Sequence, residues 1–320
     1  MEIHTSLEQF VPPPGGAVLS IGNFDGVHRG HARLLEQAHT VAARLSAAVV
    51  VITFEPHPLA VLSPERAPAL LCTPAEKLAL LARAGAERCI VLRSEPELLA
   101  QRAEDFLARL VAHTRPRALI EGPDFNFGRG RSGDIATLQR HARRWGYEVH
   151  VVPAVHCPEL PTKPVISSSS IRQALRDGRI EEAGTMLGRP YRVVGTVGRG
   201  DARGAKLGFP TTNLDGIVHV LPQHAVYAAV AQLPSGALHL AAINVGPQPT
   251  FEQAQPRVEA HLLGFAGDLH GQQLGLHFLA RLREQVRFAS AAELVAQLRQ
   301  DVAATRALAA QAAAIDAIPL

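Results

Sequence analysis

The segment SIGNFDGVHRGHARLLEQA, residues 20–38, decides the fold of the first half of the chain. It begins inside a short apolar run, AVLSI at 17–21, and continues into a stretch where Leu34, Leu35 and Ala38 recur at helical spacing. A strand, a glycine-containing turn and an amphipathic helix therefore succeed one another. Glycines let such a turn approach a ligand closely, and the start of the helix offers N–H groups that bind phosphate.

The rest of the first half repeats this alternation of strand and helix. Amphipathic stretches near 75–84, 103–113 and 134–145 separate short Val- and Ile-rich runs, which lie at 47–54, 88–93, 117–122 and 148–154. Runs of this kind suit strands that are buried on both faces. The pattern predicts an α/β domain with a doubly wound parallel sheet, whose ligands bind at the carboxyl ends of the strands.

The second half has a different rhythm. Strand-like segments follow one another without long helices between them, at 191–198, 225–233, 238–246, 257–265 and 274–283. Closely spaced strands favour a small antiparallel β-barrel. A terminal helix follows over 290–308, where Ser290 and Glu293 form a capping box. Glycine and proline at 184–191 place the boundary there, which gives domains of 1–186 and 187–320.

Composition narrows the class of protein. The 320 residues carry a formal net charge of +3, and the nearest basic patch, QRHARRW at 139–145, lacks interleaved aromatic residues. These features argue against a nucleic-acid or membrane partner. The three cysteines, Cys72, Cys89 and Cys157, form no CxxC pair, which fits a reducing compartment and excludes a cysteine-based zinc site. Without a signal peptide or an apolar run of membrane length, we expect a cytoplasmic protein.

Two histidines stand at the start of the first helix. His28 and His31 are three residues apart and share a face once the chain is helical. Imidazoles in this place can donate hydrogen bonds to phosphate oxygens and stabilise charge that builds up on an α-phosphate. The spacing alone also fits two ordinary surface histidines. Zinc is disfavoured, because no HExxH motif, cysteine partner or third ligand accompanies the pair.

A second motif, VISSSSIRQAL at 165–175, places serines directly before a helical pattern. Ser167, Ser168 or Ser169 can cap that helix, and Arg172 adds a charge-assisted contact for phosphate. A plain N-cap with a solvated arginine is the simpler alternative. Taken together, the two motifs predict an ATP site whose phosphates lie between two helix starts. A P-loop is excluded because GxxxxGK[ST] is absent.

These motifs resemble a known family. GNFDGVHRGH, TFEPHP, DFNFG and ISSSSIR resemble the adenylyltransferase half of the bacterial bifunctional riboflavin kinase/FAD synthetases, which belongs to the HxGH nucleotidylyltransferase superfamily. LGRPYRVVGTVGRGDARGAKLGFPTTNL, INVGPQPTF and VEAHLLGF resemble the kinase half. The resemblance implies transfer of AMP from ATP to FMN in the first half and phosphorylation of riboflavin in the second. It also implies Mg²⁺ with ATP, and FMN and FAD as substrate and product.

The resemblance assigns roles in the first half residue by residue. It implies catalysis by His28 and His31. The implied ATP contacts are Gly22, Phe24, Asp25, Gly26, Gly30, Ser167, Ser168, Ser169 and Arg172. The implied wall of the flavin or nucleotide pocket is formed by Phe54, Pro56, His57, Pro58, Asp124, Phe125 and Phe127.

In the second half, the resemblance makes Glu259 the catalytic base for the 5′-hydroxyl of riboflavin. Strand alternation alone puts Glu259 on the face opposite Val258 and Ala260, which also fits a solvated glutamate. The implied ATP and Mg²⁺ contacts are Lys206, Gly208, Phe209, Pro210, Thr211 and Asn213, with Thr211 and Asn213 on the metal. Oxygen donors of this kind suit Mg²⁺.

Several positions depart from the family pattern. Ala205 replaces an arginine of the kinase loop, Ala225 a glycine and His270 a tyrosine, while Ser169 stands where threonine is usual. Two alternatives remain on the sequence alone. One is a flavin- or nucleotide-binding regulator that has lost catalysis, and the other is a single-activity HxGH transferase with an accessory barrel. The sequence indicates no oligomeric state.

Overall fold

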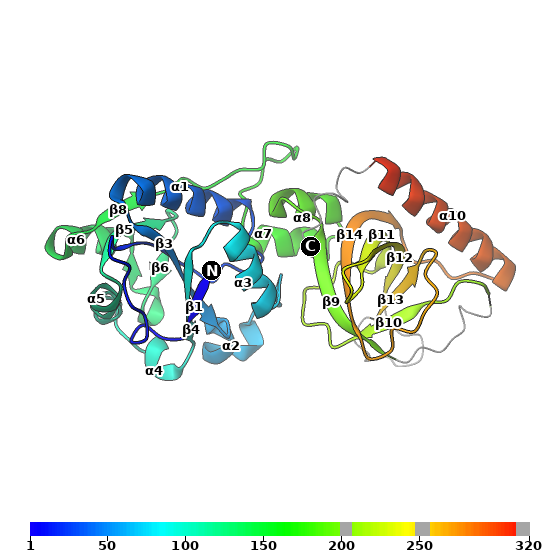
Figure 1. Ribbon diagram of the computed structural model, residues 1–320. Coiled ribbons are helices and arrows are strands. Elements are labelled where there is room, and N and C mark those ends of the chain that lie inside the picture. The colour runs from blue at the N-terminus through cyan, green and yellow to red at the C-terminus, as the bar shows by residue number, and fades with distance from the viewer. Residues whose placement is uncertain (199–206, 247–256, 312–320) are drawn as a thin grey trace. The chain divides into compact units, whose positions relative to one another are not determined.

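The computed structural model describes residues 1–198, 207–246 and 257–311 (Figure 1). Lys206 and Ala205 of the predicted kinase loop lie outside these ranges. The chain divides into two compact units. Unit 1 consists of Met1–Ala69 and Thr73–His156, and unit 2 of Leu70–Cys72 and Cys157–Leu320.

Unit 1 is built on a six-stranded sheet in the order β1-β4-β3-β2-β5-β8, and every neighbouring pair is parallel. The strands are β1 (Glu2–His4), β2 (Ala17–Ile21), β3 (Ala48–Glu55), β4 (Arg88–Arg93), β5 (Pro116–Glu121) and β8 (Glu148–Val151). The longer helices between them are α1 (Arg29–Leu45), α3 (Pro74–Arg83), α5 (Ala103–Thr114) and α6 (Ile135–Trp145). The predicted doubly wound α/β fold is confirmed.

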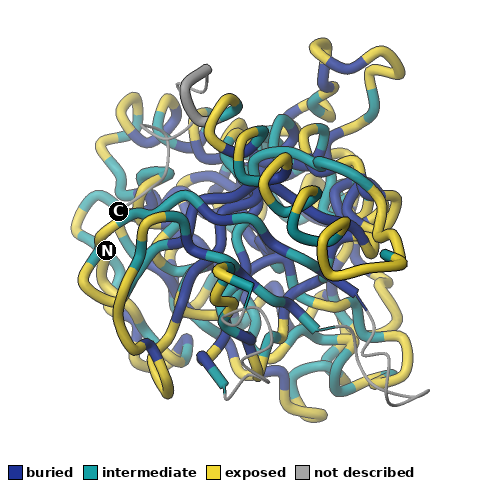
Figure 2. Tube along the Cα trace, turned by 90° about the vertical axis from the view of Figure 1, so that its right-hand side faces the viewer, coloured by how far each residue is buried: buried dark blue, intermediate teal, exposed yellow. Residues whose placement is uncertain are grey.

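The sheet buries both of its faces, as the alternation of side chains along each strand requires. Val49 and Val51 of β3 pack with α1 and α3 on one face. Val50 and Ile52 of the same strand pack with α5 and α6 on the other. In the trace of Figure 2, buried residues are dark blue and exposed residues, many of them in the outer turns, are yellow. This two-sided burial explains why the strands read as unbroken apolar runs in the sequence.

The order of the strands reverses beside β2. β3, β4 and β1 lie on one side of β2, whereas β5 and β8 lie on the other. The connections after β2 and β5 therefore leave the sheet in opposite directions, and the carboxyl ends of these two strands form the switch point at which doubly wound folds have their ligand-binding crevice. The segments that begin at Gly22 and Gly122 start at this point.

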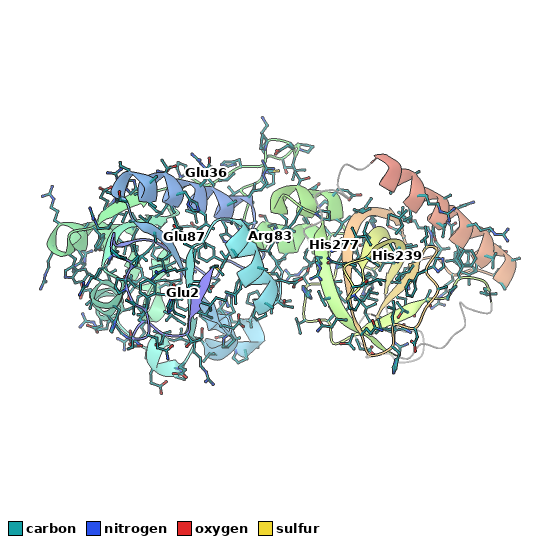
Figure 3. The ribbon with its side chains drawn as sticks, viewed as in Figure 1. Glu2, Glu36, Arg83, Glu87, His239 and His277 are labelled. Atoms are coloured by element: carbon teal, nitrogen blue, oxygen red, sulfur yellow. The ribbon has the colours of Figure 1, made fainter. Side chains whose placement is uncertain are left out.

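At the edge of the sheet, β1 pairs with β4, and Glu2 forms an ion pair with Arg88 at 3.2 Å (Figure 3). Short elements complete the unit after the strand ends. These are α2 (Pro58–Leu62), α4 (Pro96–Leu99), β6 (Asn126–Phe127) and β7 (Gly133–Asp134).

Unit 2 contains a closed barrel of antiparallel strands in the order β10-β13-β12-β11-β14-β9. The strands are β9 (Tyr191–Gly198), β10 (Thr212–Asp215), β11 (Ala225–Gln232), β12 (Leu238–Gly246), β13 (Arg257–Leu262) and β14 (Gln273–Arg283). The barrel predicted from the sequence is confirmed. Buried His277 on β14 lies with its Nε2 atom 3.3 Å from the Gln232 carboxamide oxygen of β11 (Figure 3).

The terminal helix, α10 (Ala291–Gln311), is also confirmed. The Ser290 hydroxyl accepts a hydrogen bond from the Glu293 N–H at 3.2 Å, as the predicted cap requires. An ion pair fixes the helix on the barrel, because Arg283 of β14 donates to both carboxylate oxygens of buried Asp301 at 2.8–3.2 Å. None of the helices in the described ranges is both long and apolar enough to cross a membrane.

Two further helices, α7 (Ser168–Arg176) and α8 (Ile180–Leu187), belong to unit 2. The Leu175 carbonyl accepts from the Gln223 N–H at 2.9 Å, and the Glu181 carboxylate accepts from the Arg281 N–H at 3.0 Å. These contacts attach both helices to the barrel. The division after His156 therefore differs from the boundary at 186/187 that glycine and proline indicate in the sequence.

Candidate active sites

The loop between β2 and α1 makes its turn with an unusual backbone. Phe24, Gly26 and Val27 all adopt positive φ values, of 49°, 79° and 37°. Non-glycine residues in this region are strained by about 1–3 kcal/mol each, so the surroundings must hold them. The Phe24 side chain, 2% exposed, supplies part of that support, since it is buried with its ring centroid 5.0 Å from that of His31.

His28 and His31 cap α1 with their imidazoles. His28 is the N-cap residue, and its Nδ1 accepts from the His31 N–H at 3.3 Å. His31 Nδ1 in turn accepts from the His28 N–H at 3.4 Å, and the rings stack with centroids 3.6 Å apart. A neutral imidazole has one N–H, so both rings carry it on Nε2. The helix start therefore presents two imidazole donors beside its own N–H groups, a good arrangement for an anion.

The predicted pocket turn after β3 is held from several sides. The Nδ2 atom of Asn23, from the first loop, lies 3.0 Å from Nε2 of His57. The ammonium of Lys77, a buried residue of α3, donates to the Phe54 carbonyl at 3.1 Å, and the Ser94 hydroxyl donates to the Pro56 carbonyl at 2.6 Å. Pro58 begins α2 directly after the turn.

The predicted segment after β5 carries two stacked aromatic rings. Phe125 and Phe127 have centroids 5.5 Å apart, and the Phe125 N–H donates to the Gly122 carbonyl at 3.2 Å. The Asp124 carbonyl accepts from the Asn126 side-chain amide at 2.6 Å. Gly128 ends the segment at a φ of 74°, where a Cβ would lie 2.5 Å from the Ala103 Cα atom.

Glu121 is a buried acid that the sequence reasoning missed. It lies at the end of β5 with 2% exposure, and its carboxyl accepts from the Ile21 N–H of β2 at 2.8 Å. Burial raises the pKa of Glu121 well above its ordinary value, and the hydrogen bond from Ile21 offsets this only in part. The signal was present in the sequence as one acid inside the apolar run RALIEG.

The serine motif begins α7 and belongs to unit 2. Ser167 is the N-cap, and its hydroxyl accepts from the Ser170 N–H at 3.1 Å, while Ser170 Oγ accepts from the Ser167 N–H at 2.9 Å. Ser168 and Ser169 form the first turn, and Arg172 is buried. The helix start predicted for phosphate binding is thus confirmed as a helix start. Its joint cradle with the His28 loop of unit 1 stays a prediction.

Polar side chains form a row on the outer face of the barrel. The register pairs Asn213 of β10 with Glu259 of β13, and Glu259 with Asn244 of β12. Paired residues on neighbouring strands point to the same face. Val258 and Ala260 are buried on the inner face, so the predicted alternation along this strand is confirmed. Asn244 was not predicted, and its side-chain oxygen accepts from Gln285 at 2.7 Å.

The predicted kinase loop GFPTTN leads into this row. Gly208 has a φ of 83°, Thr211 is exposed, and β10 begins at the next residue. His261, on the same face as Glu259, reaches the loop: its Nδ1 lies 2.8 Å from the Pro210 carbonyl, and its ring packs edge-on against Phe209. A carbonyl can only accept, so Nδ1 of His261 carries the proton. The sequence pattern placed His261 on this face but gave it no role.

Asn213 tests whether this site suits a cation. Its side chain is 5% exposed, and its Oδ1 atom has no hydrogen-bond partner among the described residues. A buried acceptor without a partner is costly, and the usual explanation of such a group is that it binds an ion, a water molecule or a ligand. The donor set of amide, hydroxyl and carboxylate oxygens suits Mg²⁺. In the described part of the chain, no group of three or more His, Cys, Asp or Glu side chains is arranged so that it could hold a metal ion.

Unit 1 has an HxGH helix start at the switch point of a parallel sheet, and the barrel of unit 2 carries a threonine, an asparagine and a glutamate. These features define a two-domain nucleotide-dependent transferase. Family models agree with this class. Residues 12–169 match the model described as FAD synthetase, and residues 187–309 match the model described as riboflavin kinase.

Curated relatives cover almost the whole chain. A bifunctional riboflavin kinase/FMN adenylyltransferase of Escherichia coli K12 is 38% identical over 291 residues, which are 90% of this chain and 91% of the relative. One of Pseudomonas fluorescens is 36% identical and covers 98% of this chain and 99% of its own. A solved structure titled as a macrolide-efflux protein of Streptococcus pneumoniae matches with a TM-score of 0.83 at 29% identity, covering 95% and 98%.

The chain therefore belongs to the family of bifunctional riboflavin kinases/FMN adenylyltransferases. The prediction of an enzyme with two transferase activities in FMN and FAD biosynthesis is confirmed by the two family models and by the relatives.

Proposed function

We propose that unit 1 transfers AMP from ATP to FMN at the crevice beside β2, with His28 and His31 as its catalytic pair. The FMN phosphate oxygen attacks the α-phosphorus of ATP, a new P–O–P bond forms, and pyrophosphate leaves. The reciprocal cap of the two histidines is the observation that carries this proposal, because it places the proton of each ring on Nε2 at a helix start. Donors preorganised in this way stabilise the negative charge of the transition state.

The flavin of FMN would lie against the turn of Phe54 to Pro58 and the stacked pair Phe125 and Phe127. The two segments follow β3 and β5, which lie on either side of β2, at the carboxyl edge of the sheet, where ligands of doubly wound folds bind. Aromatic rings offer a flat surface for an isoalloxazine ring. Ser168, Ser169 and Arg172 at the start of α7 would add contacts to the ATP phosphates.

We propose that unit 2 transfers the γ-phosphoryl group of ATP to riboflavin, with Glu259 as the base. The Glu259 carboxylate takes the proton of the 5′-hydroxyl, the hydroxyl oxygen attacks the γ-phosphorus, and ADP leaves. Asn213 and Thr211 would hold Mg²⁺, and the buried Oδ1 atom of Asn213, which has no hydrogen-bond partner among the described residues, supports this assignment. When bound, the ion neutralises phosphate charge and orients the nucleotide.

Product analysis over time tests the two activities together. Riboflavin with ATP and Mg²⁺ should yield FMN first and FAD afterwards, whereas FMN with ATP should yield FAD and pyrophosphate directly. FMN alone or FAD alone would identify a single-activity transferase, and binding of both ligands without turnover would identify a regulator. The ATP requirement and the three buried cysteines, none of which is in a disulfide bond in the described residues, fit the reducing cytoplasm expected from the sequence.

The two activities should also be separable. The sequence places the second domain at 187–320, but α7 and α8 contact the barrel through Leu175 and Glu181. We predict that a fragment of residues 157–320 unfolds cooperatively and makes FMN but no FAD. A fragment of 187–320, the matched control, should melt at a lower temperature because it lacks both helices. Equal melting temperatures would contradict a structural role of α7 and α8, and a folded 157–320 fragment without kinase activity would show that the site needs unit 1.

A further inference from the structure

Two of the predicted substrate segments in unit 1 are joined by one pair of side chains. Asn23 belongs to the loop after β2, and His57 belongs to the turn after β3. Their Nδ2 and Nε2 atoms lie 3.0 Å apart in a partly buried place. Neither the family match nor the proposed chemistry assigns a role to Asn23.

The hydrogen bonding of His57 fixes which atoms meet. Nδ1 of His57 accepts from the Leu59 N–H at 3.1 Å, because His57 is the N-cap of α2. A neutral imidazole that accepts at Nδ1 carries its proton on Nε2 and donates there. The carboxamide of Asn23 must then meet His57 with its oxygen, which a half-turn of the amide supplies without moving any other atom. The ring thus serves α2 with one nitrogen and Asn23 with the other.

The two segments are firmly attached to their strands on both sides of this bond. The Asn23 carbonyl accepts from the Thr53 hydroxyl at 3.2 Å, and the Gly22 N–H donates to the Ile52 carbonyl at 3.0 Å. On the other side, Lys77 and Ser94 hold the carbonyls of the pocket turn. These bonds hold the two backbones beside the sheet, and the Asn23–His57 bond adds a link between side chains of the two segments.

We propose that Asn23 and His57 are a positioning pair for adenylyl transfer, which fixes the loop that holds ATP at a defined distance from the turn that lines the flavin pocket. The inference rests on the proposed function of these two segments. Attack of one phosphate on another requires close alignment of the two substrates, and a misplacement of about 1 Å costs up to ~100-fold in rate. Loss of the pair should therefore reduce kcat for FAD formation more than it raises either KM.

Three variants separate the link from the cap of α2. Asn23→Ala removes the partner of Nε2. His57→Asn keeps an acceptor for the Leu59 N–H but cannot reach Asn23, whereas His57→Gln keeps a donor near the place of Nε2. We expect Asn23→Ala and His57→Asn each to lower kcat for FAD formation roughly 10- to 100-fold. His57→Gln should recover most of the loss, and riboflavin phosphorylation by the same samples should stay at the wild-type rate.

The double variant Asn23→Ala/His57→Asn supplies the decisive comparison. If the two residues act as a pair, kcat for FAD formation in the double variant is no lower than in the less active single variant. If their roles are independent, the two fold-losses in kcat multiply. Multiplying losses, an Asn23→Ala variant at the wild-type rate, or a failure of His57→Gln to exceed His57→Asn would each overturn the inference. His28→Ala and His31→Ala are assayed beside them: if these keep full FAD formation, it is the proposed site that fails.

Discussion

The histidines of the two candidate sites are used in opposite ways. In unit 1, His28, His31 and His57 each accept a backbone N–H at Nδ1, so their protons lie on Nε2 and their rings act as donors. In unit 2, the Nδ1–H group of His261 donates a hydrogen bond to the Pro210 carbonyl, and Nε2 of this ring is therefore an acceptor. Backbone contacts thus decide the chemistry that each ring offers.

The two sites also differ in whether their polar groups find hydrogen-bond partners within the protein. In unit 1, polar groups of the site loops form hydrogen bonds within the protein, through the histidine caps, the Asn23–His57 bond and the Lys77 and Ser94 contacts. The barrel leaves the Oδ1 atom of Asn213 without a partner among the described residues. A site that is complete in itself is preorganised for its substrates, whereas a site with an orphaned acceptor is completed by what it binds. The following changes test this difference.

Glu259→Gln should have the largest effect, on the unit 2 reaction alone. The amide keeps the volume of the side chain but cannot take a proton, and the loss of a positioned base costs ~10²–10⁴-fold in rate. Initial rates of FMN formation from riboflavin measure the loss, and FAD formation from supplied FMN on the same sample is the control. A wild-type rate of phosphorylation would mean that the base lies elsewhere.

His28→Ala or His31→Ala should lower the rate of the unit 1 reaction and leave the unit 2 reaction unchanged. Each variant loses one preorganised donor and one half of the reciprocal cap, and loss of one such donor costs ~10²–10³-fold in kcat. FAD formation from FMN and ATP is measured, with riboflavin phosphorylation as the internal reference. Near-normal FAD synthesis in both variants would remove the pair from the mechanism.

Asn213→Leu should lower kinase activity without lowering stability. Leucine has a similar size and no unsatisfied acceptor, so we expect the free energy of unfolding to stay equal or to rise by about 1 kcal/mol. The unliganded Tm measures this part. Mg²⁺ with ADP should raise the Tm of the wild type by binding the native state, and this increase should be lost in the variant. A full increase in the variant would show that Asn213 does not contribute to the metal–nucleotide site.

Glu121→Gln should have the smallest effect, on how stability depends on pH. Burial raises the pKa of Glu121 above 4.5, so the native state keeps a proton that the unfolded chain releases. The stability contributed by this group is full below pH 4.5 and falls as pH rises toward the native pKa, by about 1.4 kcal/mol for each pH unit between the two values. Thermal melts from acid to neutral pH should show unit 1 of the variant gaining stability relative to the wild type. Parallel pH profiles would contradict a neutral Glu121.

The sequence predicted regular elements well where one physical signal dominates. β2, β4, β9 and β12 occupy the predicted residues, because apolar runs or strict alternation between turn residues leave little choice. β1 and β10 were missed, since three or four residues carry too short a pattern. The two compact units divide after His156, because α7 and α8 pack on the barrel, and this tertiary contact has no signal in glycine and proline.

The candidate sites show the same division between local and long-range information. The helix starts at His28 and Ser167 could be predicted, because caps are encoded by neighbouring residues. The Asn23–His57 bond, the Lys77 contact with Phe54 and the row of Asn213, Glu259 and Asn244 join positions that are tens of residues apart. Strand order and register bring these groups together, and no local pattern contains that information.

The short outer strands of the sheet have one more consequence. β1 has three residues and β8 has four, and each carries a charged side chain in an ion pair, Glu2 with Arg88 and Glu148 with Arg44. An open sheet exposes unpaired backbone groups at its margins, to which strands of other chains can add. Short edge strands with charged side chains offer few backbone groups to an incoming strand. The barrel of unit 2 is closed and therefore has no edge strand. The chain is therefore protected against edge-to-edge aggregation at the place where a six-stranded parallel sheet is most vulnerable.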